Sequence, residues 1–229
     1  MLLAVDTSTA QVGLALYDGA QVLGEMTWAA HQHHTTELAP ALCGLLDRCG
    51  VSMDKVHALG VAIGPGSFTS LRVGLSLVKG IAFARHLPVV GLPTLDIIAA
   101  AQPVAKYPLL ALLQAGRTRI AFSVYKSQRK EWQVEGAALS GSEGPIRSGT
   151  VEELVNQIES PTIIAGELTS EDRKKLSKNI NVLLASPVNC VRRPSVLAEL
   201  AWARWQADQV DDAAALAPIY LHVAGTPIK

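Results

Sequence analysis

The sequence has few charged residues, no net charge and no long apolar run. Only 17% of its 229 residues are charged, and 20 basic side chains balance 20 acidic ones. A protein that binds nucleic acid on its own needs a basic face, so this balance argues against one. No apolar run reaches the roughly 18 residues of a membrane-spanning helix, so none is expected to cross a membrane.

Cysteine is scarce as well. Cys43, Cys49 and Cys190 have no metal-binding spacing and leave an odd count, so no disulfide framework is expected. The N-terminal apolar run stops at Asp6 and no basic residue precedes it, which is not the pattern of a signal peptide. These features predict a protein of the reducing cytoplasm.

Apolar side chains, by contrast, make up 49% of the sequence and give it a mean hydropathy of +0.25. This content is enough for substantial cores, and the length predicts one large domain or two small lobes. Because the polar coat is thin, the composition favours surfaces that are covered in a complex.

The chain is organised around a glycine-rich turn at residues 64–70, GPGSFTS, between an apolar strand at 59–63 and a helix to about Ala84. Glycine lets a backbone approach a ligand closely, and a helix start presents free N–H groups, so this stretch can hold a phosphate. The same glycines could instead let the helix pack tightly on the strand. Ser67 is expected to cap the helix.

The predicted helix carries two apolar stripes instead of one. The first is Leu71, Leu75, Val78 and Ala82, and the second is Val73, Leu77, Ile81 and Ala84. Together they span roughly 200°, about twice the usual core-facing arc. We interpret one face as packed on the chain's own sheet and the other on a second chain, with Gly74 and Gly80 allowing close approach. Burial of both faces inside a large domain is the alternative.

The order of predicted elements describes one plan used twice. The first half has strands at 2–7, 12–17, 22–28, 56–63 and 89–92, with helices from Thr35 or Thr36 to about Cys49, at 67–84 and at 95–102. The second half has strands at 109–114, 120–125, 132–139, 162–165 and 182–185, with helices at 151–159, 171–178 and 195–207. A meander followed by βα crossovers gives a mixed sheet flanked by helices. We therefore expect an α/β fold with two lobes, residues 1–104 and 105–229.

Three motifs resemble the TsaB (YeaZ) family of bacterial proteins for making threonylcarbamoyladenosine on tRNA. They are VDTS at 5–8, GPGSFT at 64–69, and LRVG at 71–74 followed by KG at 79–80. The resemblance is strong over residues 1–100 and weaker beyond, although PIYL at 218–221 is also similar. It implies the duplicated actin-like or Hsp70-like ATPase fold (ribonuclease-H-like), which matches the element order.

The resemblance also implies a role as a non-catalytic subunit that pairs with TsaD, which transfers threonylcarbamoyl to the adenosine adjacent to the anticodon. The ATPase TsaE is an expected partner, a homodimer is expected without TsaD, and tRNA is expected to be reached through the complex. No cofactor is expected to bind tightly, and ATP or ADP with Mg²⁺ is expected only within the complex.

The family's subunit interface is built from two N-terminal helices, here about 35–48 and 67–84. The residues assigned to it are Leu38, Leu42, Leu45, Leu71, Arg72, Gly74, Leu75, Val78, Lys79 and Ala82.

A phosphate or nucleotide contact is a second expectation. The residues assigned to it are Asp6, Thr7, Ser8, Gly64, Gly66 and Ser67. The resemblance places Asp6 where an actin-like ATPase holds Mg²⁺ or phosphate, but the carboxylate could equally cap the turn at 7–9. Hydrolysis by this chain alone would need more ligands and a positioned water.

No metal site is predicted. TsaD-like catalytic proteins carry a His-x-x-x-His pair after the strand that follows the glycine turn, whereas residues 91–99 here, GLPTLDIIA, contain no histidine. Aliphatic side chains cannot replace such ligands. The cluster of His31, His33 and His34 could bind a metal weakly, or be a solvated loop.

The alternative function is an actin-like phosphotransferase or a metallopeptidase-like enzyme. A ribonuclease-H-like nuclease is discarded because Asp6 has no companion carboxylate at Gly64.

Two positions depart from the family's pattern. Gln114 stands where members often have Asp, and His222 stands where a basic residue is common. If Gln114 replaces a carboxylate that orders metal or phosphate, nucleotide chemistry in this subunit is expected even less.

Overall fold

A computed structural model describes residues 1–30, 33–116, 119–128, 131–134 and 146–220 of the chain. Two compact units make up this part. Unit 1 comprises residues 1–97 and 192–219, and unit 2 comprises residues 98–191 with Tyr220. The chain therefore leaves unit 1, builds unit 2, and returns to unit 1 at Arg192.

Unit 1 is a five-stranded mixed sheet with helices on both faces. Its elements are β1 (Leu2–Asp6), β2 (Gln11–Tyr17), β3 (Val22–Ala29), α1 (His34–Cys49), a 3-10 turn (Met53–Lys55), β4 (Ala58–Gly64), α2 (Phe68–Arg85), β5 (Val89–Pro93) and α6 (Pro194–Gln206). The strand order is β3-β2-β1-β4-β5. The β1–β2 and β2–β3 pairs are antiparallel, whereas β4 joins β1 and β5 joins β4 in parallel.

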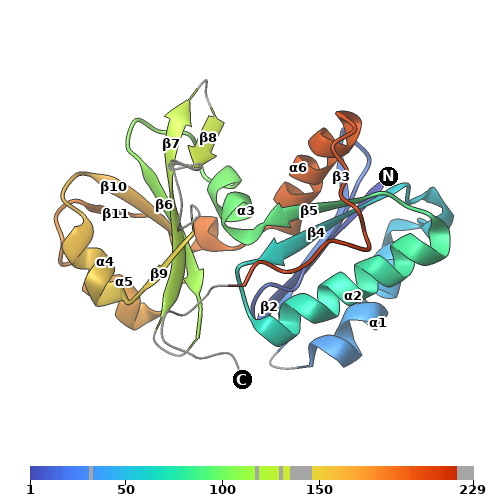
Figure 1. Ribbon diagram of the computed structural model, residues 1–229, viewed down its shortest axis with the longest axis horizontal. Coiled ribbons are helices and arrows are strands. Elements are labelled where there is room, and N and C mark those ends of the chain that lie inside the picture. Colours follow the sequence, from blue (N-terminus) through green and yellow to red (C-terminus); the bar gives the residue numbers. More distant parts are fainter. Residues whose placement is uncertain (31–32, 117–118, 129–130, 135–145, 221–229) are drawn as a thin grey trace. The chain divides into compact units, whose positions relative to one another are not determined.

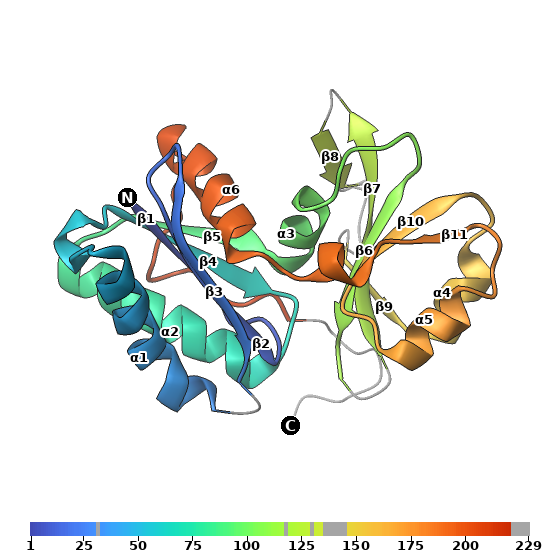
Figure 2. The same ribbon diagram turned by 180° about the vertical axis from the view of Figure 1, so that it is seen from behind.

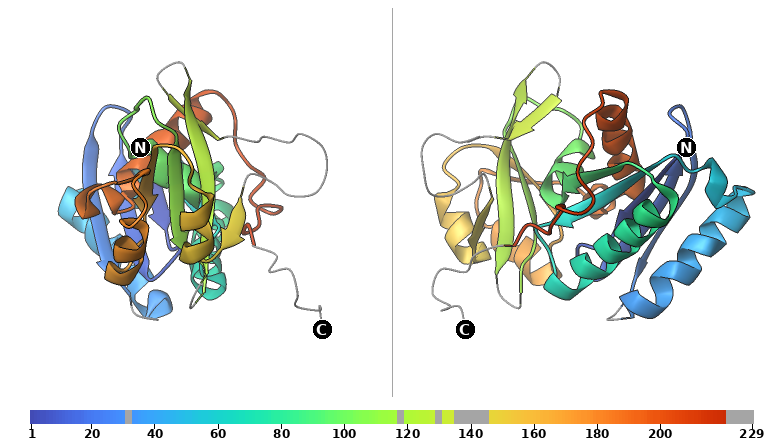
Figure 3. Two further views of the ribbon diagram at one scale, coloured as in Figure 1. Left: turned by 90° about the vertical axis from the view of Figure 1, so that its left-hand side faces the viewer. Right: turned by 45° about the vertical axis from the view of Figure 1, so that its right-hand side comes forward.

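The sheet of unit 1 is buried on both sides, with α1 and α2 side by side on one face and α6 on the other (Figures 1 and 3). Strands covered on both faces are apolar throughout, which explains the unbroken run at the start of the chain. Leu3 and Val5 of β1 join the cluster under α1 and α2, while Leu2 and Ala4 pack against α6. A Cβ at Gly60 would lie only 2.8 Å from the Ala201 Cβ, so α6 lies close on β4.

Unit 2 repeats this arrangement. Its elements are β6 (Leu109–Gln114), β7 (Ile120–Gln128), β8 (Glu131–Val134), β9 (Arg147–Gly149), α4 (Val151–Gln157), β10 (Thr162–Gly166), α5 (Ser170–Leu176), β11 (Val182–Leu184) and a 3-10 turn (Pro187–Cys190), while α3 (Thr94–Ala100) crosses the boundary from unit 1. The strand order is β11-β10-β6-β7-β8, and β9 pairs with β7. Figure 2 shows α4 and α5 next to one another beside this sheet.

The two sheets correspond strand by strand. In each unit the first strand pairs antiparallel with the second, and two later strands add in parallel on its other side, β4 and β5 in unit 1 and β10 and β11 in unit 2. Unit 2 has β9 in addition, which pairs antiparallel with β7. The prediction of two mixed sheets built on one repeated plan is therefore confirmed. The predicted second lobe, residues 105–229, needs correction. Residues 192–219 return to unit 1, because α6 supplies the cover for one face of its sheet.

Local signals placed most helix starts correctly. Ser67 caps α2 as expected, its Oγ accepting from the Ser70 N–H at 3.5 Å. For α1 the expected caps Thr35 and Thr36 are wrong, because the helix already begins at His34 with no side-chain cap. The predicted strand at 132–139 is described only to Val134. No helix in the described part of the chain is both long and apolar enough to cross a membrane.

Candidate functional site

The carboxylate of Asp6, at the end of β1, is buried and fully engaged by its own chain. Its Oδ1 accepts from the Ser8 N–H at 2.8 Å, so the expected turn cap is present. Its Oδ2 accepts from Arg192 Nε, also at 2.8 Å, and both side chains of this ion pair are less than 5% exposed. The guanidinium also donates to Thr9 Oγ1 and to the Gln11 carbonyl. Asp6 therefore does not present a free charge.

The neighbouring hydroxyls are engaged as well. Thr7 Oγ1 donates to the Ser70 carbonyl at 2.7 Å, which ties the end of β1 to the first turn of α2. Ser8 Oγ lies 2.8 Å from Thr94 Oγ1 at the start of α3, and both residues are fully buried. Among the described residues, no buried side-chain nitrogen or oxygen lacks a hydrogen-bond partner.

The glycines of the turn make room for the chain itself. A Cβ at Gly66 would overlap the Ser8 carbonyl, which accepts from the Ser67 N–H. At Gly64, with φ +105, a Cβ would lie 2.8 Å from the Ile219 carbonyl. Of the two interpretations of the glycine turn, the geometry favours tight packing over phosphate binding. The residues assigned to a nucleotide contact lie together, and the carboxylate among them is already paired with Arg192.

The residues assigned to a subunit interface fall into two groups. Most lie in the core of unit 1, under α1 and α2, and are Leu38, Leu42, Leu45, Leu71, Gly74, Leu75, Val78 and Ala82. Gly74 faces the end of β1, where a Cβ would overlap Thr7 Oγ1. These eight need correction, because side chains buried in the chain's own core cannot contact a second chain. Only Arg72, which is exposed, and Lys79, which is half-buried, reach the surface.

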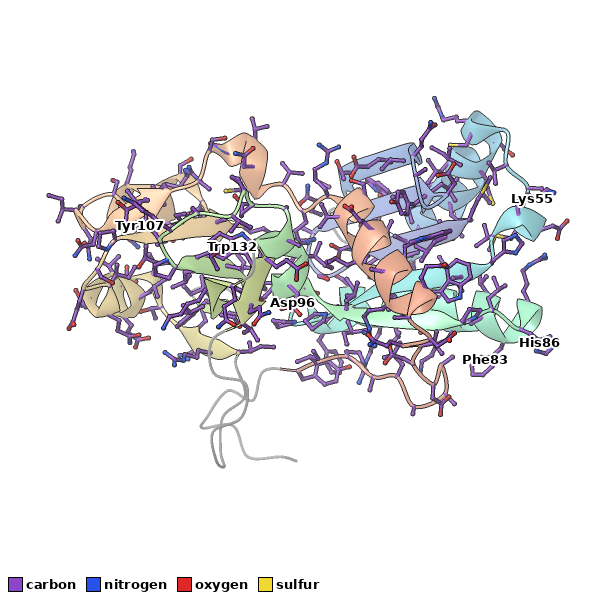
Figure 4. All side chains as sticks on the ribbon, turned by 90° about the horizontal axis from the view of Figure 1, so that it is seen from above. Lys55, Phe83, His86, Asp96, Tyr107 and Trp132 are labelled. Atoms are coloured by element: carbon purple, nitrogen blue, oxygen red, sulfur yellow. The ribbon has the colours of Figure 1, made fainter. Side chains whose placement is uncertain are left out.

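The surface of α2 is formed by other residues. We call the exposed residues Thr69, Arg72, Ser76, Gly80, Phe83 and Ala84 the α2 outer face. They occupy an arc of roughly 120° at 100° per residue. Phe83 is 57% exposed and extends from the C-terminal part of the helix (Figure 4). Apart from the helix's own backbone, no atom of the described residues lies within 4 Å of a Cβ built at Gly80. Small residues with a large exposed aromatic group make this a surface suited to close helix packing.

Beside the N-terminal end of this face, a hollow of about 420 Å³ opens between α1 and α2. It is lined by Thr35, Phe68, Thr69, Arg72, Val73 and Ser76. A hollow of about 790 Å³ shares three of these residues and is lined by Ala10, His34, Thr35, Ser67, Thr69, Ser70 and Val73. The Arg72 guanidinium stacks on the exposed Phe68 ring, 3.6 Å from its centroid. Exposed aromatic and arginine side chains beside a hollow are typical of protein interfaces.

The two described members of the histidine cluster, His33 and His34, differ in their surroundings. His34 is buried, and its Nε2 lies 2.9 Å from the Thr9 carbonyl. His33 is exposed, and His31 lies outside the described residues. Within the described ranges, no three His, Cys, Asp or Glu side chains gather as metal ligands.

The two departures from the family's pattern differ in what can be said of them. Gln114, at the end of β6, donates from Nε2 to Asp172 Oδ2 at 3.0 Å. Asp172 also closes the capping box of α5 with Thr169. Gln114 therefore ties β6 to the start of α5. His222 lies outside the described residues.

Comparison with known proteins gives a consistent picture. The family model described as "TsaD: tRNA N6-adenosine threonylcarbamoyltransferase" matches residues 25–144, just over half of the chain. The tRNA threonylcarbamoyladenosine biosynthesis protein TsaB of Bacillus subtilis (strain 168) is 24% identical over 230 residues, covering 100% of this chain and 96% of its own. The tRNA N6-adenosine threonylcarbamoyltransferase of Geobacter sulfurreducens is 33% identical over 135 residues, covering 51% of this chain and 40% of its own.

The solved structures agree. YeaZ from Pseudomonas aeruginosa has a TM-score of 0.75 and 25% identity, and the match covers 96% of this chain and 99% of that one. The ethanolamine utilization protein EutJ from Carboxydothermus hydrogenoformans has a TM-score of 0.52 at 11% identity, which concerns the fold alone. The two repeated sheets and these matches define a protein of the actin-like ATPase fold. Within that class the chain belongs to the family of TsaD and TsaB proteins, and its full-length match is to TsaB (YeaZ).

The structure brings in one functional candidate that the sequence did not suggest. Arg192 reaches Asp6 across 186 positions of the chain, and no local pattern signals this pairing. Phe68 and Phe83, on the α2 outer face or beside it, could have been found, because they are large apolar residues that belong to neither apolar stripe of the helix.

Proposed function

We propose that this chain is a non-catalytic, cytoplasmic subunit in the biosynthesis of threonylcarbamoyladenosine on tRNA, and that it acts by pairing with TsaD. Family membership supports the pathway. The observation that carries the non-catalytic role is the closed end of β1, where Asp6 is ion-paired with Arg192 and the hydroxyls around it bond within the chain.

The contact surface we propose consists of the α2 outer face with the neighbouring exposed residues of α1, Ala39, Pro40 and Cys43. It replaces the assignment made from the sequence, which named core residues. The same surface would serve in a homodimer when TsaD is absent. TsaE and tRNA would then join through the complex, which is also where ATP or ADP and Mg²⁺ would be used.

Gly80 offers a matched pair of variants for testing this surface. Replacing a helix-interior glycine by alanine or arginine stabilises the isolated helix by roughly 0.5–1 kcal/mol, and at Gly80 no neighbouring atom opposes a side chain. Gly80→Arg therefore keeps the monomer folded while its long charged side chain blocks close helix packing. Gly80→Ala is the control, because it adds one methyl group only.

The experiment is size-exclusion chromatography with light scattering on each protein alone and mixed with the cognate TsaD. The wild type and Gly80→Ala should form a one-to-one complex with TsaD, and Gly80→Arg should remain separate from it. A Gly80→Arg variant that still elutes with TsaD would place the contact elsewhere. A wild-type protein that forms no complex with TsaD would contradict the proposed function itself.

A further inference from the structure

The end of β1 carries the oxygen ligands of a hard-cation site, but an arginine already holds them. Around the Arg192 guanidinium lie Asp6 Oδ2 at 2.8 Å, Thr9 Oγ1 at 3.1 Å and the Gln11 carbonyl at 2.9 Å. A carboxylate, a hydroxyl and a carbonyl oxygen are the kinds of ligand that Mg²⁺ and Ca²⁺ take from proteins. Here all three accept from N–H groups of one side chain.

We infer that Arg192 is the resident cation of this site, and that it keeps a divalent cation, and any nucleotide bound through one, away from Asp6. The pair is buried, with 1% of the arginine and 4% of the aspartate side chain exposed. A guanidinium is always charged and its planar fork fixes several acceptors at once, so it does not leave by losing a proton. It is also covalently attached, which makes its local concentration independent of the solution.

The backbone that follows Arg192 is held in place by contacts with β3. It is the first residue of the segment that returns to unit 1, and it lies two residues before Pro194, where α6 begins. Its neighbour Arg193 pairs with Glu25 of β3, and the Glu25 carboxylate accepts from the Ser195 N–H at 3.1 Å and from its Oγ at 2.7 Å. These contacts fix the backbone next to Arg192, and the guanidinium itself is held by its hydrogen bonds to Asp6, Thr9 and the Gln11 carbonyl.

Three variants separate a resident cation from an ordinary buried ion pair. Arg192→Met removes the charge and keeps an unbranched side chain, so it leaves Asp6 as an uncompensated buried carboxylate. The double variant Asp6→Asn with Arg192→Met removes both charges, keeps the shape of the Asp6 side chain, and differs from Arg192→Met only in the carboxylate. Arg192→Lys keeps a positive charge at the site. Each is compared with the wild type by thermal unfolding, with and without Mn²⁺, and by the electron paramagnetic resonance signal of free Mn²⁺.

The wild type and Arg192→Lys should bind no Mn²⁺ and should keep their melting temperature when it is added. Arg192→Met should melt about 6–20 °C lower, as expected for breaking a buried pair in a chain of this size, and Mn²⁺ should recover part of that loss. The double variant should not respond to Mn²⁺. If Arg192→Met does not fold alone, its refolding yield should rise with Mn²⁺ while that of the double variant stays constant.

Two results would overturn the inference. One is saturable Mn²⁺ binding by the wild type. The other is an Arg192→Met variant whose stability or refolding yield responds to Mn²⁺ no more than that of the double variant. The inference deepens the proposed non-catalytic role but is measured without TsaD, so its failure would leave the pairing with TsaD to its own experiment.

Discussion

Two glycines six positions apart on α2 should respond in opposite ways to the same substitution. Gly74 faces inward, and a Cβ there would overlap Thr7 Oγ1. Gly80 faces outward, with no atom within 4 Å of its added Cβ. Both have φ values that allow alanine, since neither lies among the glycines with positive φ. Both substitutions therefore gain the same helix propensity, and any difference in stability between them comes from what the added methyl group contacts.

The magnitudes follow from three contributions. In a helix interior, alanine is favoured over glycine by about 1 kcal/mol, which applies to both sites. At Gly74 the extra methyl group overpacks a buried contact, at a cost of about 1–3 kcal/mol. Moving Thr7 also weakens its 2.7 Å hydrogen bond to the Ser70 carbonyl, which costs about 0.5–1.5 kcal/mol. The net expectation is a loss of roughly 0.5–3.5 kcal/mol for Gly74→Ala and a gain of about 1 kcal/mol for Gly80→Ala.

Urea unfolding followed by circular dichroism would measure both variants against the wild type. Thermal unfolding gives a second measurement, because each kcal/mol of unfolding free energy shifts the melting temperature by about 2–4 °C in a chain of this size. The melting temperature should be higher for Gly80→Ala and lower for Gly74→Ala than for the wild type. Equal or greater stability of Gly74→Ala would refute the inward orientation of this side of α2, and with it our reassignment of the interface. The control is the slope of free energy against urea, which should stay unchanged if both variants keep the same fold.

Two further predictions concern the ends of the sheet in unit 1. Glu25→Gln should lower stability by about 1–2 kcal/mol, because the carboxylate caps α6. Burial raises the pKa of Glu25, but hydrogen bonds from Arg193 and Ser195 outweigh it and hold the pKa below its ordinary value of 4.5. This contribution should therefore be complete above about pH 4.5 and disappear as pH falls through the lower folded-state value. A wild type and a Glu25→Gln variant that differ equally at pH 7 and pH 3 in urea unfolding would contradict it. Gly66→Ala should lower stability by about 1–3 kcal/mol, since its Cβ would overlap the Ser8 carbonyl. An unchanged urea midpoint would show that this glycine is not needed for packing.

The sequence was sufficient for the order and type of most elements. Apolar runs and turn residues located the strands of both sheets apart from the short β9, and the Ser67 cap fixed the start of α2 to within one residue. Repetition of one plan could be seen because each half has the same sequence of strands and helices. These are local properties, set by patterns within some 20 residues.

What the sequence could not supply was the partner of each surface. Periodicity shows that α2 is apolar over a wide arc, but not which stripe faces the sheet. The structure buries Leu71 and Val78 and leaves Val73 and Leu77 only partly buried against the core. The ion pair between Asp6 and Arg192 and the return of α6 to unit 1 depend on contacts between distant parts of the chain. No local propensity encodes them.

The division of unit 1 into two stretches of chain has a consequence for the order in which the protein is built. On the ribosome, β1 to β5 emerge first, but the face of their sheet that packs against α6 must wait until residues 194–206 have been made. Until then Leu2, Ala4 and Val90 lack the part of their cover that Leu197, Ala198 and Ala201 of α6 supply. All of unit 2 except Tyr220 is synthesised in the interval. A nascent chain stalled before α6 would therefore expose an apolar face of this sheet. Such a surface is prone to aggregation and is bound by chaperones.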